Sequence, residues 1–536
     1  MKQFFTFFLF FCAVAANAQN NYSTRSGLDP ALEPFYHGVA SGDPLSDRVI
    51  IWSRVTPNGS FVSGDSIEVA WRMATDTGMT NIVNSGTFYT KEDRDFTIKV
   101  DVTGLNPESC YYYDFFAYGK YSVRGRTKTA PTGDIDSLRF AVMSCSNYEY
   151  GYFHSYRSLV NRDDIDAVLH LGDYIYEYEV GGYSANIPGR EHDPVTETIT
   201  LQDYRTRYSH YRLDEDCRDV HQQFPFITVW DDHESTDNSW KDGAENHTDG
   251  VEGVWSDRKG FSMQAYFEWL PVREAAPGDY TLYRKLSYGD LIDLFMLDTR
   301  LEGRDEQVGT TSPAIDDPSR SLLGTTQYNW LTTELSNSTA RWKIIGQQVM
   351  FAPLEVFGTP VNADQWDGYA YERDQLVDFF LNNTDNIVVL TGDIHTSWAN
   401  DIPGPSYDSG TGSGSAGVEF VVTSVTSPGL SLPVGSGLIQ TFNPHMKYID
   451  LSEKGYLILD VNKNRAQADW YYVSDVTQAY SGEAHGAGYF VNYNERWLNQ
   501  ASSPSSRIDP GCIAAPEDPI STSVSIEESP MQMVGI

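Results

Sequence analysis

The fold is decided by a stretch that reads Ala167-Val168-Leu169-His170-Leu171-Gly172-Asp173, where an apolar run ends in a glycine and an acidic residue. An apolar run of this length is typical of a strand that is covered on both faces. Similar runs end at Ser144-Cys145, Asp231-Asp232-His233, Asp298, Gly346-Gln347-Gln348 and Gly392-Asp393-Ile394-His395. Helical stretches at 326–335 and 373–381 lie between some of these runs. The sequence therefore predicts an α/β domain over residues 136–480.

Polar residues recur at the point where each predicted strand ends. In open α/β sheets, ligands gather at the carboxyl ends of the strands. A single strand followed by Gly-Asp often means only a turn, but three acidic strand ends together with Cys145 and His395 are harder to explain in that way. The pattern predicts one shared metal site.

Two pairs of residues have spacings that suit a common ligand. Asp173 and Tyr176 are about one helical turn apart, so both side chains can face one point. A phenolate is a hard anionic donor suited to ferric iron, although one tyrosine among 34 can equally be a packing residue. Asp393 and His395 stand at i and i+2, which places them on one side of an extended segment. Cys145 is interpreted either as a small buried hydrophobe or as a thiolate held by metal.

The motif Asp231-Asp232-His233-Glu234 places a carboxylate next to an imidazole. Because consecutive side chains point in different directions, we expect Asp232 and His233 to divide the work, one facing a metal and the other the substrate. The alternative is an acidic loop with a surface histidine. Asn238 is either a further oxygen ligand or a residue that only shapes the loop.

The segment 30–130 has a different pattern, with short alternating runs rich in β-formers and separated by turn residues. Such runs predict a small antiparallel β-sandwich domain of the fibronectin or immunoglobulin type. The stretch 105–113 resembles the tyrosine-corner region of fibronectin-like sandwiches. Residues 130–134 read as a linker to the α/β domain.

The ends of the chain and its charge limit the functional classes. Residues 1–18 have the form of a secretory signal peptide, whose apolar run is too short to span a bilayer, so we expect a secreted monomer, periplasmic, extracellular or on the cell surface, without a transmembrane segment. The formal net charge of −36 argues against nucleic acid or an anionic membrane as a partner. Residues 502–536 are rich in Ser, Pro and Glu and predict an irregular extension.

Four cysteines remain after such a cleavage: Cys110, Cys145, Cys217 and Cys512. An oxidising compartment favours their pairing unless a metal or the interior takes one. If a metal holds one of them, one of the other three stays unpaired, and the sequence leaves the pairing open.

Taken in order, five motifs carry a resemblance to a known family. Ser144-Cys145, His170 to Tyr176, Trp230 to Glu234, Gly346 to Met350 and Gly392 to Thr396 resemble the motifs of PhoD-like alkaline phosphatases, and Gly38 to Pro44 resembles the entry motif of that family. The resemblance covers roughly residues 35 to 475. The family includes phosphodiesterases and is similar to purple acid phosphatases, which implies a four-layer α/β/β/α metallophosphoesterase core after the β-sandwich.

The resemblance also implies a set of metals and ligands. Ferric iron (Fe3+) would be held by Cys145, Asp173, Tyr176 and His395. Calcium (Ca2+) would be held by the bridging Asp173 together with Asp232 and Asp393, with Asn238 as a helper. Oxygen-rich ligands at this second site favour calcium over zinc. Gln347 and Gln348 stand where related enzymes supply a histidine, so no ligand is assigned there.

The function that this set predicts is hydrolysis of a phosphoester. We expect in-line attack on phosphorus by a metal-bound hydroxide, with Asp173 and His233 as the catalytic residues and His233 acting near the leaving oxygen. The alternatives are a phosphodiesterase or phospholipase D of the same fold, or a non-catalytic surface-binding protein stabilised by calcium. The choice between monoester and diester stays open at this point.

Overall fold

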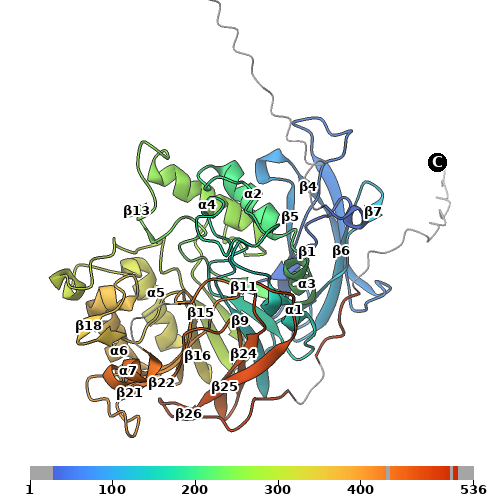
Figure 1. Cartoon of the computed structure of the whole chain (residues 1–536). Helices are drawn as coiled ribbons and strands as arrows, with labels where there is room; N and C mark the ends of the chain where they lie inside the picture. Colours follow the sequence, from blue (N-terminus) through green and yellow to red (C-terminus); the bar gives the residue numbers. More distant parts are fainter. Residues whose placement is uncertain (1–27, 430–434, 508–510, 517–536) are drawn as a thin grey trace, which may run out of the picture.

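The computed structural model describes residues 28–429, 435–507 and 511–516. The predicted signal peptide, residues 1–18, and residues 517–536 of the predicted extension lie outside the described residues. Two large sheets pack face to face at the centre of the described chain, with helices on their outer sides (Figure 1). Within the described residues, no helix has the length and hydrophobicity that crossing a membrane requires.

The first sheet has ten strands in the order β26-β25-β24-β23-β9-β10-β11-β1-β2-β5. Strands β9, β10, β11 and β1 are parallel, so their carboxyl ends meet at one edge. The strands are β1 Val39–Gly42, β2 Arg48–Arg54, β5 Thr97–Thr103, β9 Ser137–Met143, β10 Ala167–His170, β11 Pro225–Thr228, β23 Gly455–Asn462, β24 Arg465–Val473, β25 Glu483–Asn492 and β26 Asn499–Gln500.

The second sheet has seven strands in the order β14-β15-β16-β19-β21-β20-β22. Strands β15, β16, β19 and β21 are parallel. The strands are β14 Arg284–Tyr288, β15 Ile292–Met296, β16 Trp342–Gly346, β19 Ile387–Thr391, β20 Ser397–Pro403, β21 Ser415–Val421 and β22 Met446–Asp450.

Seven α-helices lie among the described residues: α1 His154–Val160, α2 Leu201–Tyr211, α3 Glu215–Gln223, α4 Trp255–Trp269, α5 Gly324–Asn337, α6 Ala370–Asn383 and α7 Ser436–Phe442. Helices α5 and α6 contain both helical stretches that the sequence predicts. Short elements complete the chain: η1 Pro30–Leu32, η2 Glu92–Arg94, η3 Pro313–Asp316, η4 Trp366–Tyr369, the hairpin β12 Ser239–Trp240 with β13 Gly243–Ala244, and the hairpin β17 Glu355–Val356 with β18 Thr359–Pro360.

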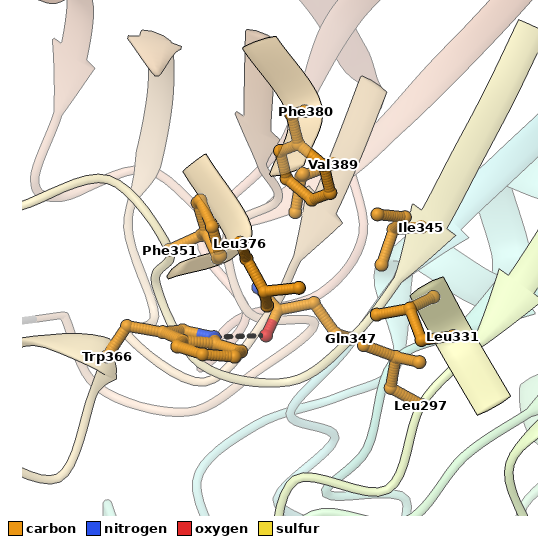
Figure 2. A pocket seen from close by; sticks show the side chains of 9 residues that line it. All are labelled: Leu297, Leu331, Ile345, Gln347, Phe351, Trp366, Leu376, Phe380 and Val389. Atoms are coloured by element: carbon orange, nitrogen blue, oxygen red, sulfur yellow. Dashed lines mark hydrogen bonds between the residues drawn. The ribbon is translucent and has the colours of Figure 1, made fainter. Parts of the chain in front are cut away.

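Alternation along the strands of the second sheet separates two apolar layers. Ile344 of β16 and Val388 of β19 belong to the core between the two sheets. Their neighbours Ile345 and Val389 point the other way, into a cluster with side chains of α5 and α6. Figure 2 shows this outer layer, which encloses a cavity of about 10 Å³. Because successive strand residues face opposite sides, one apolar run serves both layers.

The N-terminal segment is joined to the α/β core more closely than a separate domain would be. A five-stranded sheet holds β4 Ile82–Thr90, β3 Ile67–Ala74, β6 Cys110–Ala117, β7 Lys120–Tyr121 and β8 Gly125–Lys128. In contrast, β1, β2 and β5 continue the ten-stranded sheet, with β1 parallel to β11. Along β2, Ile51 faces the N-terminal apolar cluster and Trp52 faces the main core. A strand with two apolar faces can join both layers, which is why alternation alone does not reveal its partner sheet.

The resemblance to a tyrosine corner corresponds to a hydrogen bond. The backbone N–H of Asn106 donates to the hydroxyl of Tyr111 over 2.8 Å. This bond fixes the chain just before β6 begins.

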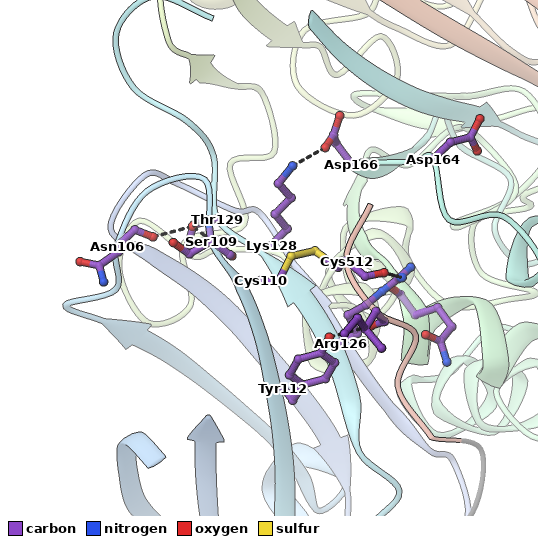
Figure 3. The surroundings of a disulfide bond; sticks show 12 residues. Asn106, Ser109, Cys110, Tyr112, Arg126, Lys128, Thr129, Asp164, Asp166 and Cys512 are labelled. Atoms are coloured by element: carbon purple, nitrogen blue, oxygen red, sulfur yellow. Dashed lines mark hydrogen bonds and ion pairs between the residues drawn. A yellow bond between two sulfur atoms is a disulfide. The ribbon is translucent and has the colours of Figure 1, made fainter. Parts of the chain in front are cut away.

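A disulfide between Cys110 and Cys512 ties the C-terminal segment 511–516 to the start of β6 (Figure 3). Hydrogen bonds to the backbone of this segment also hold it. Arg126 donates to the carbonyl of Cys512, and the side chain of Gln223 both donates to and accepts from Ala515. Described residues 501–507 and 511–516 contain no helix or strand, yet this part of the tail is fixed against β6, β8 and α3. Cys217 and Cys145 are free and buried.

Candidate metal centre

The carboxyl ends of four parallel strands deliver the candidate ligands to one place. Cys145 follows β9, Asp173 follows β10, Asp232 follows β11, and Asp393 and His395 follow β19. The two sheets pack against each other, so ligands from β19 meet those from the other three strands.

Four of these residues have a left-handed backbone: φ is 61° at Cys145, 55° at Asp173, 61° at Asp393 and 59° at His395. Such values are uncommon for residues other than glycine and cluster at functional sites. All four lie in the turns that follow the strands, where their side chains contribute to the candidate ligand groups.

Two glycines let the strand ends approach one another. A Cβ added at Gly392 would lie 2.8 Å from Cβ of Ser144, and one at Gly172 would overlap Cβ of Asp231. A side chain at either position would push the ligand loops apart. The Gly-Asp pairs of the sequence therefore combine a ligand with the small residue that brings it close.

The first group of candidate ligands contains sulfur, oxygen and nitrogen. Ligand atoms of Cys145, Asp173 and His395 all lie within 4.8 Å of one another. The hydroxyl of Tyr176 is 2.9 Å from Oδ2 of Asp173 and 3.2 Å from Nε2 of His395, and it accepts a hydrogen bond from Ser427 over 2.6 Å. The structure thus brings together all four residues that the resemblance assigns to iron.

The second group is made of carboxylates. Oxygens of Asp231, Asp232 and Asp393 lie within 4.8 Å of one another, and Asp173 and Asp232 form a further group with His233. Asp173 therefore belongs to both sides of the site, as expected for a bridging ligand. Asn238 contacts Asp232 through its backbone N–H over 2.7 Å, while its side-chain amide donates to Glu245.

A fully buried arginine, which sequence reasoning missed, lies among the carboxylates. The Arg300 guanidinium donates to Asp231, to Asp364 over 2.8 Å and to Asp393 over 3.0 Å, and it is 3.7 Å from Asp232. Asp364 is also paired with Arg304. Arg300 comes two residues after Asp298, one of the recognised strand ends, so the position was indicated but its role was not.

The charges of this centre do not balance within the protein. Four carboxylates, those of Asp231, Asp232, Asp364 and Asp393, lie against the two guanidinium groups of Arg300 and Arg304, and a fifth, that of Asp173, lies within 4.8 Å of Asp232. Oδ1 of Asp173 and Oδ2 of Asp231 are buried and have no hydrogen-bond partner among the described residues. Buried carboxylates need pairing or a bound cation, so this set fits multivalent cations.

Burial opposes ionisation of the first group in the protein alone. Burial, with the neighbouring Asp173, raises the pKa of Cys145 and of Tyr176 well above the usual values. Burial also raises the pKa of Asp173, and it lowers that of His395 to about 3, which keeps the imidazole neutral. A metal ion reverses this preference, because its charge stabilises thiolate, phenolate and carboxylate together. The first group therefore places a neutral thiol, phenol and imidazole around one carboxyl group. A cation of high charge would stabilise the ionised forms of the thiol, the phenol and the carboxyl group.

His233 has the opposite electrostatic character. Its Nδ1 lies 2.7 Å from Oε2 of the fully buried Glu177, and its ring stacks on Tyr176 with centroids 4.2 Å apart. Burial alone would lower the pKa of His233, but Glu177 and Asp232 raise it well above its usual value. Glu177 was missed by sequence reasoning, where it is one more acidic residue in Tyr176-Glu177-Tyr178. His233 is held as a proton donor at the edge of the site.

The side-chain amides of Gln347 and Gln348 are engaged in hydrogen bonds within the core. Both amide atoms of Gln348 bond to backbone or to Thr299, and Gln347 bonds to Val349, Thr391 and Trp366. These glutamines fix the turn after β16, as neutral polar residues inside the core.

Comparisons with known proteins identify a common family for the fold and the site. A model of the PhoD-like phosphatase matches residues 140–470, and a model of its N-terminal domain matches residues 21–131. The chain is 35% identical to alkaline phosphatase D of Bacillus subtilis (strain 168) over 511 residues, which cover 92% of this chain and 85% of that protein.

A solved structure described as the structure of PhoD is 34% identical and superposes with a TM-score of 0.81, covering 89% of this chain and 94% of that one. The predicted fold class, an α/β core of two large sheets after an N-terminal all-β part, is confirmed by this match. The predicted family resemblance is confirmed as well.

Proposed function

The chain belongs to the PhoD-like phosphatase family, and on this premise we propose that it hydrolyses phosphomonoesters at the strand-end site. The observation that carries the proposal is that two ligand groups share Asp173, one with Cys145 and His395 and the other with Asp232 and His233. The first group offers sulfur and imidazole beside the phenol of Tyr176, and the second is linked through Asp232 to the carboxylates of Asp231 and Asp393. A phosphate dianion could reach this point only if cations offset the surrounding negative charge.

Ferric iron and calcium are the proposed cations. Cys145, Asp173, Tyr176 and His395 would hold the iron, whereas Asp173, Asp232 and Asp393, with Asn238 as a helper, would hold calcium. The phenol and thiol support a ferric ion, and the oxygen-only set supports calcium. When bound, such cations neutralise the phosphate oxygens and lower the pKa of coordinated water.

Side chains of the protein would protonate the leaving oxygen and orient the metal ligands. Glu177 accepts a hydrogen bond from Nδ1 of His233 and keeps the imidazolium charged, which leaves Nε2–H for the leaving oxygen. Arg300 orients Asp232 and Asp393 by contacting both. His233 is therefore the proposed general acid, and Glu177 and Arg300 are positioning residues.

The role of His233 is tested with two aryl substrates that differ in leaving-group strength. For His233→Asn, kcat/KM for phenyl phosphate is expected to fall by about 10²- to 10⁴-fold, and that for p-nitrophenyl phosphate far less, since a good leaving group needs little protonation. Equal losses on both substrates would remove His233 from this role. The variant Glu177→Gln keeps a hydrogen-bond acceptor but loses the charge, so the alkaline limb of the pH profile is expected to move to lower pH.

The metals and the reaction are tested together in the purified protein. We expect iron and calcium by elemental analysis, release of phosphate from p-nitrophenyl phosphate, and a visible absorption band that is lost in Tyr176→Phe. Bis(p-nitrophenyl) phosphate in the same assay measures diesterase activity. A protein without iron, without calcium and without hydrolysis of either ester would instead be a non-catalytic binding protein.

Secretion is proposed from two independent features. The Cys110–Cys512 disulfide supports folding in an oxidising compartment, and residues 1–18 have the composition of a signal peptide. Expression of the full chain should place the protein in the envelope or the medium, with the leader removed in its mass spectrum. A full-length chain recovered from the cytoplasm would refute secretion and leave the phosphatase proposal intact.

A further inference from the structure

Tyrosine side chains line the site on the side of His233. Tyr178 lies with its ring centroid 5.3 Å from that of His233, and Tyr183 lies 5.7 Å from Tyr178 and 6.0 Å from Tyr176. Tyr150 extends the row, 6.5 Å from Tyr183. We call Tyr150, Tyr178 and Tyr183 the tyrosine wall.

The tyrosine wall differs from the ligands in exposure. Tyr176 and His233 are buried, whereas all three residues of the wall are partly exposed. An apolar core would cover these rings fully, and a solvated surface would not order them at 5 to 7 Å from one another. The wall is therefore aromatic surface presented at the mouth of the site.

The loop that carries Tyr178 and Tyr183 is held in place by buried charges. Arg207 is fully buried and donates to the carbonyl of Tyr178 and to two further carbonyls of the same loop. Glu149, also buried, accepts from the N–H of Gly181 and of His192, each over 2.9 Å. A wall fixed in this way needs no rearrangement to receive a flat group, which lowers the entropy cost of binding.

The position of the wall decides which part of a substrate meets it. This step rests on the proposed function, in which His233 protonates the leaving oxygen. The substituent on that oxygen must then extend past His233, toward Tyr178 and Tyr183. On the same side lies Asp237, close enough to Tyr178 to add to the effect of burial in raising the pKa of its phenol, and its carboxyl group disfavours a second anionic group there.

We propose that the tyrosine wall is the leaving-group subsite. It selects phosphomonoesters whose leaving group carries a flat, uncharged aromatic ring, and nucleoside monophosphates and aryl phosphates are such esters. A planar group stacks favourably on partly exposed rings, and such stacking tolerates different substituents on that group. A sugar phosphate offers no such face, and a polyphosphate brings further negative charge. The wall sets the selectivity, while the strand-end ligands recognise the phosphate.

The test compares two substrates with the same leaving atom, adenosine 5′-monophosphate and ribose 5-phosphate. Both release a primary alcohol, so they differ in the base alone. The wild-type protein is expected to favour the nucleotide in kcat/KM by about tenfold or more, mainly through KM. In Tyr183→Ala this preference is expected to disappear because only the nucleotide loses rate, whereas Tyr183→Phe is expected to keep it.

Two controls separate the wall from folding and from the reaction itself. Tyr89→Ala removes a tyrosine that is 59% exposed on β4, and it should change neither substrate. Adenosine, which carries no phosphate, should inhibit the wild type competitively and Tyr183→Ala about tenfold less.

The outcomes also distinguish this inference from the proposed function. Equal kcat/KM for the two substrates in the wild type, or equal losses on both in Tyr183→Ala, would overturn the leaving-group subsite while the phosphatase proposal stands. No hydrolysis of either substrate by the metal-loaded protein would overturn the proposed function, and the subsite with it.

Discussion

The strand-end site and the outer face of the second sheet share strand β19 but differ in how their polar groups are satisfied. On the outer face, Ile345 and Val389 pack with Leu376 and Phe380 of α6, and the polar residue of this layer in Figure 2, Gln347, is neutral and hydrogen-bonded. At the strand ends, four carboxylates lie against two guanidinium groups, and the carboxyl group of Asp173 lies beside them. The buried amide of the outer face finds its hydrogen-bond partners within the protein, whereas the carboxylates of the site are not all neutralised by protein groups.

This difference separates two reasons for burying a polar group. Gln347 donates to Val349 and Thr391 and accepts from Trp366, so burial leaves its amide satisfied. Asp173 keeps a buried oxygen without a partner among the described residues, and its backbone is left-handed. A protein tolerates such costs where a ligand offsets them, so the two regions should respond differently to substitution.

The largest effect is expected at the residue shared by both ligand groups. Asp173→Asn keeps the size of the side chain but removes the charge that both proposed cations need, so kcat/KM should fall by at least about 10³-fold and the iron content with it. Steady-state kinetics and elemental analysis measure the change. A folded Asp173→Asn protein with wild-type metal content and activity would contradict the proposed bridging role.

The next effect belongs to the outer face and is one of stability alone. Phe380→Ala empties a fully buried position between α6 and the sheet, which should lower the free energy of unfolding by about 3 to 5 kcal/mol. Phe357→Ala is a matched control, because Phe357 is 75% exposed, and should change it by no more than about 0.5 kcal/mol. Denaturant unfolding measures both. A loss of kcat in folded Phe380→Ala would show that the two regions are not independent.

The sequence predicts a feature of these regions when the residues that form it are close together along the chain. The apolar runs and the polar residues that end them are local, and they located the strand ends of Cys145, Asp173, Asp232, Asp393 and His395. The contribution of Arg300 could not be found in this way. It depends on Asp231, Asp364 and Asp393, which reach the guanidinium from loops 64 to 93 residues away.

The N-terminal part gives the same lesson at the level of sheets. The short β-rich runs of residues 30–130 predicted strands but not their neighbours, because a strand such as β2, which is covered on both faces, can pair at the edge of either sheet. The partner of Cys110 was equally hidden, since Cys512 is 402 residues away. The local sequence pattern indicates whether a segment forms a helix or a strand. Which strands and which cysteines pair across long sequence separations is seen only in the folded structure.

A smaller effect concerns a histidine that, like Gln347, is buried as a neutral group. Burial lowers the pKa of His445 to about 4, and its Nε2 lies 2.9 Å from the carbonyl oxygen of Pro353. Because the folded pKa lies below the unfolded value of about 6.5, the stabilisation is complete above pH 6.5 and is lost as pH falls toward 4. The loss amounts to about 3 kcal/mol at most.

His445→Gln isolates this contribution, since glutamine can donate to Pro353 and does not titrate in this range. The difference in unfolding free energy between wild type and His445→Gln should shift against the wild type between pH 7 and pH 4. Groups common to both proteins cancel in that difference. A difference independent of pH would mean that His445 keeps an ordinary pKa in the folded protein.

The smallest effect expected is that of the single neutral hydrogen bond between Trp366 and Gln347. Its two atoms, Nε1 and Oε1, are 3.0 Å apart and both belong to neutral groups, so the bond should contribute about 1 kcal/mol. Trp366→Phe alone also removes packing, and a double-mutant cycle with Gln347→Met separates the two contributions. A coupling energy near 1 kcal/mol, with unchanged kcat, is expected because the outer face is already complete without a ligand. A coupling that changed on adding metal would instead connect this layer to the strand-end site through Thr391, which bonds Gln347 and precedes Gly392-Asp393.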